Sequence, residues 1–131
     1  MAYFMTGTVF NAGSGGGGSN MHTYSETEHE VGTWVDGNPV YEKTINTGNL
    51  PNKTTKTTAH GISHLDKVIN VFGVAYSSTY NAHIPLPYMN VAGLSYCIGL
   101  YVSNTDIYTI SNTDMSSYGN AYVTIQYTKS A

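Results

Sequence analysis

Apolar and polar residues alternate in short runs along most of the chain, and turn-forming residues separate the runs. The clearest alternation lies near the end, where Ala121, Val123, Ile125 and Tyr127 share one parity. A strand places such residues on one face of a sheet, because successive side chains point to opposite faces. No stretch repeats with the 3.6-residue period of a helix over three turns. The pattern therefore predicts an all-β fold, an antiparallel β-sandwich of jelly-roll or Greek-key-like topology.

The expected strands are separated by clear turn signals. A hairpin is predicted over 31–45, because Asp36 and Gly37 form a strong turn signal between two alternating runs. Further strands are expected at 54–60, 65–76, 94–102, 106–110 and 121–128. In the run 94–102 the residues expected on one face are Leu94, Tyr96, Ile98, Leu100 and Val102.

The run 65–76 differs from the others because its apolar residues occur on both parities. Ile69 and Val71 lie on one parity and Phe72 lies on the other. A strand of this kind is expected to be covered on both sides, by the core or by a neighbouring subunit. These three residues are therefore candidates for core or subunit packing, and Trp34 joins them because Trp carries a large apolar surface.

The sequence divides into three parts within a length typical of one domain. Residues 1–10 are a short N-terminal segment, either a docking peptide or a non-native addition. Residues 11–23 are rich in Gly and Ser and are expected to form a flexible tether. Residues 24–131 contain the alternating runs and are expected to form the β-sandwich domain.

Composition narrows the possible functions. Five basic residues, all Lys, stand against eight acidic ones, a net charge of −3. A chain without Arg or a basic excess is a poor nucleic-acid binder. No apolar run is long enough to span a membrane, the N-terminus shows no secretory signal, and the single Cys97 excludes an intrachain disulfide. Twelve Tyr and only 10% charged residues suit contact with an uncharged partner.

Several motifs of the chain resemble one family. An opening motif reads Y-S-x-x-E-x-x-V-G-x-W-x-D-G-x-P-x-Y-x-K-T over 24–44, and shorter pieces read G-x-L-P-N, A-H-G-I and L-D over 48–66. The chain closes with D-x-S-x-Y over 114–118 and A-Y-V-T-I-Q-Y-T-K over 121–129. Together these motifs resemble the head domains at the C-terminal tips of bacteriophage tail fibres and related receptor-binding proteins.

The resemblance implies a fold, an assembly and a role. Such heads are small homotrimeric β-sandwiches that join the rest of the tail fibre and attach the virion to a receptor on the host bacterium, often a surface glycan. The implied location is the tip of the virion's tail fibre, after synthesis in the host cytoplasm. Family members often have a basic residue after the Asp of the closing motif, where this chain has Met115.

The segment 77–90 is the expected ligand-binding loop, because it joins two strong strands and carries adaptable contact side chains. Its candidate ligand-binding residues are Tyr80, Asn81, His83, Tyr88 and Asn90. The alternative is that the loop is structural filler. Tyr118 is a sixth candidate, and its alternative role is in a turn where Asp114 and Ser116 bond local backbone N–H groups.

The acidic residues and histidines give only weak indications of a metal. His60 and His64 lack a third ligand at a recognised spacing. Glu26, Glu28 and Glu30 alternate, and on a strand they would share one face. That face is either a solvated edge that resists strand pairing or a site for a divalent cation such as calcium. No metal site and no cofactor are predicted beyond this weak candidate.

No pattern of catalytic residues stands out. The chain has no Gly-x-Ser-x-Gly motif, and its Asp residues are expected at turns or strand ends rather than as a facing pair. The sequence therefore predicts a binding protein without catalysis. Two alternatives stay open: a structural fibre cap with no receptor role, and a monomeric carbohydrate-binding module.

Overall fold

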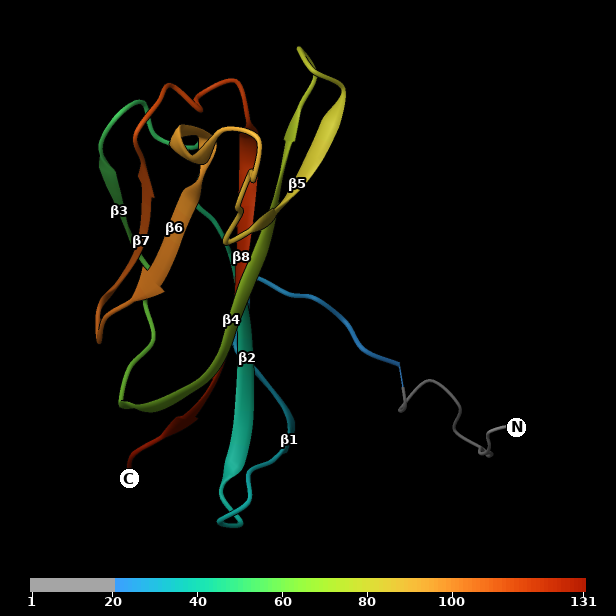
Figure 1. The fold of residues 1–131 in the computed structure, drawn as a ribbon. Helices are drawn as coiled ribbons and strands as arrows, with labels where there is room; N and C mark the ends of the chain where they lie inside the picture. Colours follow the sequence, from blue (N-terminus) through green and yellow to red (C-terminus); the bar gives the residue numbers. More distant parts are fainter. Residues whose placement is uncertain (1–20) are drawn as a thin grey trace.

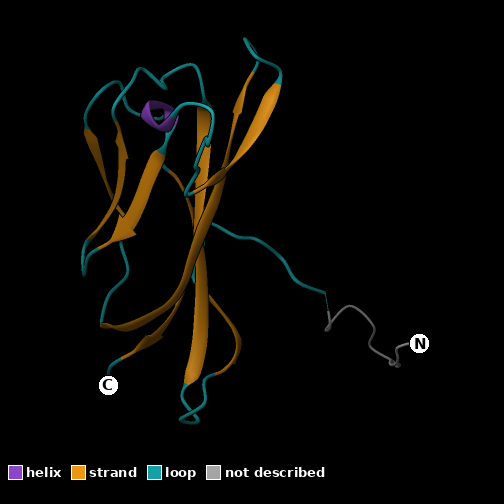
Figure 2. Cartoon of the chain, in the orientation of Figure 1, coloured by secondary structure: helices purple, strands orange, loops and turns teal. Residues whose placement is uncertain are grey.

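The computed structural model describes residues 21–131, so the segment 1–10 and most of the tether lie outside the described residues. The described chain is all-β, as predicted (Figure 1). Its strands are β1 (His29–Thr33), β2 (Pro39–Asn46), β3 (Thr55–Ala59), β4 (Leu65–Ser77), β5 (Ala82–Leu86), β6 (Ile98–Val102), β7 (Asp106–Ser111) and β8 (Gly119–Lys129). Helical structure in this range is the short 3-10 turn η2 (Leu94–Tyr96) (Figure 2). It holds no helix long and apolar enough to cross a membrane.

The strands form two antiparallel sheets. The large sheet has the order β1-β2-β8-β4-β5, and the small sheet has the order β3-β7-β6. The last strand, β8, lies at the centre of the large sheet and pairs with both β2 and β4. The small sheet lies against one side of the large sheet, on the left in Figure 1. The segment 21–28, blue in Figure 1, approaches the large sheet from the opposite side.

The core contains apolar side chains from both sheets. Val123 and Ile125 of β8 and Ile107 of β7 belong to one buried cluster. The alternation predicted for β8 is confirmed, because Ala121, Val123, Ile125 and Tyr127 are all 0% exposed. Full burial of an aliphatic side chain of this size contributes about 1.5–3 kcal/mol. The buried set also fixes the register of β8, since a slip of one residue would turn it toward the solvent.

The predicted hairpin is formed by β1 and β2. Gly37 N–H donates to Trp34 O at 2.9 Å, and Gly37 has a φ of 88°, which glycine adopts without a steric penalty. The Asp36 carboxylate accepts a hydrogen bond of 3.0 Å from Asn38 N–H. Trp34 therefore lies half-buried in the turn and outside the core cluster. Subunit packing is the role that stays a prediction for Trp34.

Strand β4 matches the predicted run 65–76 and has two different faces. Val71 and Gly73 pair with β8 residues whose side chains belong to the core. The other face, which we call the outer face of the large sheet, carries Phe72 and Val74, and Val74 is 46% exposed. Ile69 lies at an irregularity in the β4–β8 pairing. The core side of β4 is therefore covered within one chain. That a second copy covers the outer face stays a prediction.

The run 94–102 is only partly a strand. The hairpin of β6 and β7 is present as predicted, but β6 begins at Ile98. Before it, Tyr96 N–H donates to Gly93 O at 2.9 Å, so this backbone is committed to a local turn and not to a sheet ladder. Leu94 and Tyr96, expected to share a strand face with Ile98, are 67% and 51% exposed, whereas Ile98 is 2% exposed. That part of the strand prediction is wrong.

Candidate functional site

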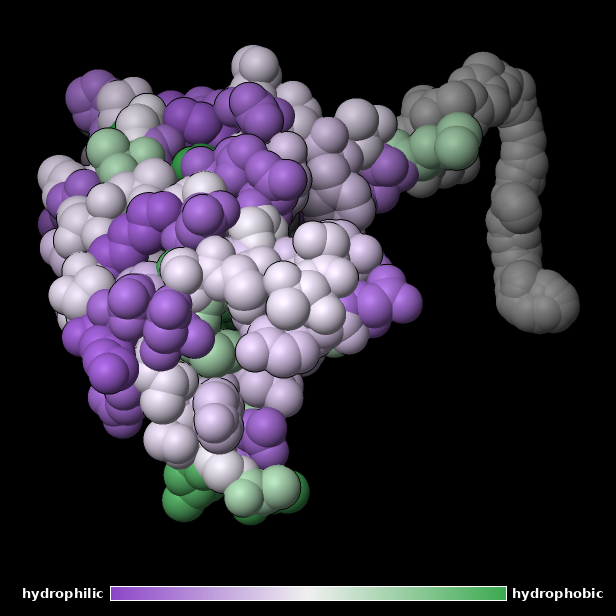
Figure 3. All heavy atoms as spheres, turned by 90° about the horizontal axis from the view of Figure 1, so that it is seen from above, coloured by the Kyte–Doolittle hydropathy of each residue, from purple (hydrophilic) through white to green (hydrophobic). Residues whose placement is uncertain are grey.

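An open pocket lies where the β4–β5 turn, η2 and the β7–β8 connection meet. We call it the tyrosine pocket, and its volume is about 280 Å³. Its lining residues are Tyr80, Tyr88, Asn90, Tyr96, Asp114, Met115, Ser117 and Tyr118. Figure 3 looks down on this end of the molecule, whose surface is mostly polar or weakly polar, with small apolar areas between.

Two of the tyrosines are placed by the ends of β4 and β5. Tyr80 lies in the β4–β5 turn, where its N–H donates to the hydroxyl of the buried Ser77 at 3.4 Å. Tyr88 follows β5 and exchanges backbone hydrogen bonds of 3.2 and 2.9 Å with Ile98, the first residue of β6. The backbone of each tyrosine is thus fixed by hydrogen bonds to a buried residue.

A tight turn places Asn90 and Tyr96. Asn90 Oδ1 accepts from Ala92 N–H at 3.0 Å, and Asn90 O accepts from Gly93 N–H at 3.2 Å. A Cβ at Gly93 would lie 2.9 Å from the Tyr96 ring, so the close approach of this ring depends on glycine. The turn directs a half-exposed Tyr96 to the pocket rim.

The segment before β8 supplies the remaining wall. Asp114 Oδ1 accepts from Ser116 N–H at 3.0 Å and from Ser116 Oγ–H at 2.6 Å. These hydrogen bonds keep the pKa of Asp114 below its ordinary value. The predicted turn made by Asp114 and Ser116 is therefore present. It sets Tyr118 in the wall and Met115, which is 4% exposed, beside it.

The Tyr118 hydroxyl keeps its proton at neutral pH and can donate a hydrogen bond. Burial raises the pKa of Tyr118, and the neighbouring Tyr88 and Tyr80 raise it further. The rings of Tyr80 and Tyr118 are nearly parallel, at 22°, with centroids 6.1 Å apart. Tyr80 is 66% exposed at the rim, whereas Tyr118 is half-buried. The pocket thus offers flat aromatic faces together with hydroxyl and amide groups.

Four of the six predicted ligand-binding residues line this pocket. They are Tyr80, Tyr88, Asn90 and Tyr118. The other two lie outside its lining: the Asn81 side chain accepts a hydrogen bond from the Tyr76 hydroxyl, and the His83 ring packs on the Tyr76 ring with centroids 4.6 Å apart. Reasoning from sequence missed Tyr96 and Ser117. Tyr96 was assigned to one face of a strand together with Ile98, and Ser117 lies in a polar run without a distinctive signal.

A larger open pocket, about 480 Å³, lies on the outer face of the large sheet. Phe72 and Val74 of β4 form part of its floor, and Tyr24 in the segment before β1 is on its rim. The hydroxyls of Thr44 and Thr124 bond each other across β2 and β8 at 2.9 Å. With these hydroxyls paired, the floor is mostly apolar.

The three glutamates proposed as a weak cation site lie in different surroundings. The chain bends at Glu26, and β1 begins only after Glu28, so the strand alternation is broken. The Glu28 carboxylate accepts hydrogen bonds from Tyr127 and Lys129, whereas Glu30 is exposed on β1. The structure does not bring the three carboxylates together.

His60 serves a structural purpose. It is buried, its Nδ1 accepts from Ile62 N–H at 3.1 Å, and its Nε2–H donates to Ser103 O at 3.0 Å. Both ring nitrogens are therefore occupied. His64 is exposed at a left-handed backbone position with a φ of 57°.

Comparison of the chain with known proteins gives no match to a protein-family model, to a curated protein or to a solved structure.

Proposed function

We propose that the chain is the head domain at the tip of a bacteriophage tail-fibre-like protein, and that it binds a host surface glycan through the tyrosine pocket. The motifs over 24–44 and 114–129 support the family. The two antiparallel sheets support a sandwich of the head-domain kind. A Greek-key-like topology is consistent with the sheet order, in which β8 returns to lie beside β2.

The observation that carries the proposal is the convergence of tyrosines from separate segments on one pocket. Tyr80, Tyr88, Tyr96 and Tyr118 are joined there by Asn90 and Ser117. Sugar rings present apolar C–H faces that pack on aromatic rings, and hydroxyls that need hydrogen-bond partners. Aromatic rings with few rotatable bonds and small polar side chains supply both at low entropic cost.

The same pocket supports binding without catalysis. Hydrolysis of a glycosidic bond ordinarily uses two carboxyl groups facing each other across the sugar. The residues that line the tyrosine pocket include one carboxylate, Asp114, and its Oδ1 is already held by Ser116. We therefore assign this site to recognition.

The outer face supports the trimeric assembly implied by the resemblance. Phe72, Val74 and Tyr122 make an apolar area on a sheet face that residues 21–131 leave open. An exposed apolar area of this kind ordinarily marks a surface that contacts another protein molecule. Three heads joined at one fibre tip would bind a repetitive glycan by avidity, so each pocket needs only weak affinity.

Substitution of the exposed rim tyrosines tests the function. Tyr80→Ala and Tyr96→Ala should each weaken binding to host cells, or to immobilised bacterial polysaccharide, by about 2- to 10-fold, since an aromatic contact is worth about 0.5–1.5 kcal/mol beyond its buried area. Both residues are exposed, so the thermal midpoint should stay within about 2 °C of the wild type. Binding would be measured by surface plasmon resonance and by adsorption to cells.

The matched control is Tyr101→Ala, which removes a half-exposed tyrosine of the small sheet outside the pocket. It should leave binding unchanged. Loss of binding in Tyr101→Ala alone would move the glycan site to the small sheet. If the wild type binds but no variant alters binding, the tyrosine pocket is not the binding site. If the wild type binds no polysaccharide or cell, the head is a structural fibre cap and the receptor role is wrong.

A further inference from the structure

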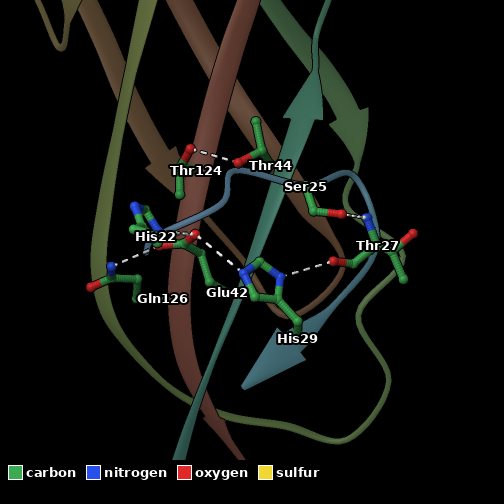
Figure 4. A network of polar contacts seen from close by, with 8 residues as sticks. All are labelled: His22, Ser25, Thr27, His29, Glu42, Thr44, Thr124 and Gln126. Atoms are coloured by element: carbon green, nitrogen blue, oxygen red, sulfur yellow. Dashed lines mark hydrogen bonds and ion pairs between the residues drawn. The ribbon is translucent and has the colours of Figure 1, made fainter. Parts of the chain in front are cut away.

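Three side chains with metal-binding atoms meet at the large sheet (Figure 4). His22 precedes β1, His29 is the first residue of β1, and Glu42 lies in β2. One ligand atom from each lies within 4.8 Å of the other two. The cluster shares no residue with the tyrosine pocket, so what it binds is independent of the glycan proposal.

Glu42 is the buried centre of this cluster. Its side chain is 0% exposed. Oε2 accepts from Gln126 Nε2 at 2.9 Å, and Oε1 lies 2.7 Å from His22 Nε2. Burial of a carboxylate is costly unless a positive charge or a metal ion compensates it. Glu42 therefore calls for a cation at Oε1, the oxygen that both histidines approach.

The His29 ring is oriented with an unpaired nitrogen toward the same oxygen. Its Nδ1 lies 3.1 Å from Thr27 O, which can only accept, so Nδ1 carries the hydrogen and Nε2 of the neutral ring has a free lone pair. His29 Nε2 is buried without a hydrogen-bond partner among the described residues, and it lies 3.7 Å from Glu42 Oε1. His29 Nε2 and Glu42 Oε1 thus face each other across a gap too long for a hydrogen bond.

We propose that His22 Nε2, His29 Nε2 and Glu42 Oε1 bind a zinc ion. Zinc takes imidazole nitrogen and carboxylate oxygen at about 2.0–2.2 Å in a tetrahedron, which sets its ligand atoms about 3.3 Å apart. The distances of 2.7 and 3.7 Å to Glu42 Oε1 lie on either side of that value. Two imidazoles favour zinc over calcium or magnesium, which prefer oxygen ligands.

The neighbours of the cluster match the supporting contacts of metal sites. A metal-binding histidine ordinarily donates its other ring N–H to a carbonyl, and a metal-binding carboxylate is itself hydrogen-bonded. Thr27 O and Gln126 Nε2 make these contacts. His22 is 43% exposed, so it can move by the few tenths of an ångström that binding requires, and water can reach the cluster from its side.

The ion would fasten the segment before β1 to the sheet. His22 lies in an irregular segment, whereas His29 and Glu42 lie on paired strands. Zinc would thus stabilise the start of the domain at the point where the Gly-rich stretch 11–20 joins it. A ligand that binds only the folded chain raises its thermal midpoint, here by several degrees at saturating zinc.

The test is zinc binding to the full chain without a purification tag, stripped with a chelator beforehand. Residues 1–20 contain no His, Cys, Asp or Glu, so they add no competing side-chain ligand. Calorimetric titration should give one zinc ion per chain, and cobalt should give the intense visible absorption of a tetrahedral site. His22→Ala, His29→Ala and Glu42→Gln should each weaken zinc binding at least tenfold and abolish the zinc-dependent rise in thermal midpoint.

The matched control is His64→Asn, which removes an exposed histidine and keeps a residue that tolerates its left-handed backbone. This variant should bind zinc like the wild type. Because His22 is exposed in an irregular segment, His22→Ala reports on binding even if Glu42→Gln fails to fold. Zinc affinity weaker than about 100 μM, or affinity unchanged in His22→Ala and His29→Ala, overturns the proposal.

Discussion

Glu28 connects the segment before β1 to the last strand of the protein. Its carboxylate accepts hydrogen bonds from the Tyr127 hydroxyl and from Lys129 Nζ, the latter at 2.8 Å. Lys129 Nζ also lies 5.5 Å from the centroid of the Tyr41 ring, within cation–π range. Partial burial raises the pKa of Glu28, but the hydrogen bonds from Lys129 and Tyr127 outweigh it, so the net pKa lies below the ordinary value. One carboxylate thus joins two ends of the domain.

The lowered pKa of Glu28 predicts a loss of stability in acid. A depressed carboxyl pKa contributes stability that is present above the unfolded value, about 4.5, and is lost as the pH falls through the folded value. Glu28→Gln should therefore lower the thermal midpoint at pH 7, and its difference from the wild type should shrink as the pH falls below the unfolded value. Thermal melts between pH 3 and pH 7 measure this. Glu30→Gln, at an exposed position of β1, is the control and should follow the wild type. Parallel curves for Glu28→Gln and the wild type would contradict the prediction.

The pairing of β4 with β8 depends on one close backbone approach. Gly73 of β4 lies opposite Val123 in the centre of the large sheet. A Cβ on Gly73 would lie 2.5 Å from Tyr122 O, which belongs to the backbone of β8 and cannot move aside alone. Gly99 of β6 is different, because a Cβ there would meet Ile110 at an ordinary 3.5 Å. The close packing of β4 on β8 therefore requires glycine at position 73, whereas the space at Gly99 would accept a Cβ.

Gly73→Ala should destabilise the fold by about 1–3 kcal/mol, the usual cost of forcing an extra carbon into a packed site. Gly99→Ala should change stability by less than about 1 kcal/mol, and in the stabilising direction, because alanine loses less backbone entropy than glycine. Urea denaturation of both variants at one protein concentration separates the two cases. Equal changes in stability for the two variants would contradict the prediction. They would mean that β4 and β8 can move apart at Gly73 without loss of stability.

Elements whose pattern is local were predictable from the sequence. Strand β8 alternates without interruption, and the β1–β2 hairpin has its Asp36-Gly37 signal, so both were found. The turn η2 was missed because Leu94 and Tyr96 continue the alternation of β6, while backbone hydrogen bonds within the turn decide the structure. An alternating pattern cannot distinguish a strand from an exposed turn that happens to carry the same residues.

At the scale of the whole molecule, sites depend on which elements meet. Tyr80 and Tyr88 were found because the segment 77–90, predicted as one loop, carries both, although strand β5 lies between them. No sequence spacing connects that segment to Tyr96. The His22–Glu42 contact joins residues 20 positions apart on different elements, and no motif marks it. The outer face likewise follows from which side of the large sheet the small sheet packs on. The sequence indicated that β4 carries apolar residues on both parities, but not which surface of the molecule each parity belongs to.

The outer face gives a prediction about assembly. If three copies cover it, the chain in solution should have a mass of about 42 kDa, three times 14.1 kDa. Val74→Glu places a charge on this face and should reduce the mass to about 14 kDa without unfolding the monomer, because Val74 is 46% exposed there. Tyr101→Glu, a similar change on the small sheet, should leave the trimer intact. Light scattering on a sizing column measures the mass of the wild type and of both variants. A wild-type mass of about 14 kDa at high concentration would contradict self-association through this face, and it would favour a monomeric carbohydrate-binding module that uses the same tyrosine pocket.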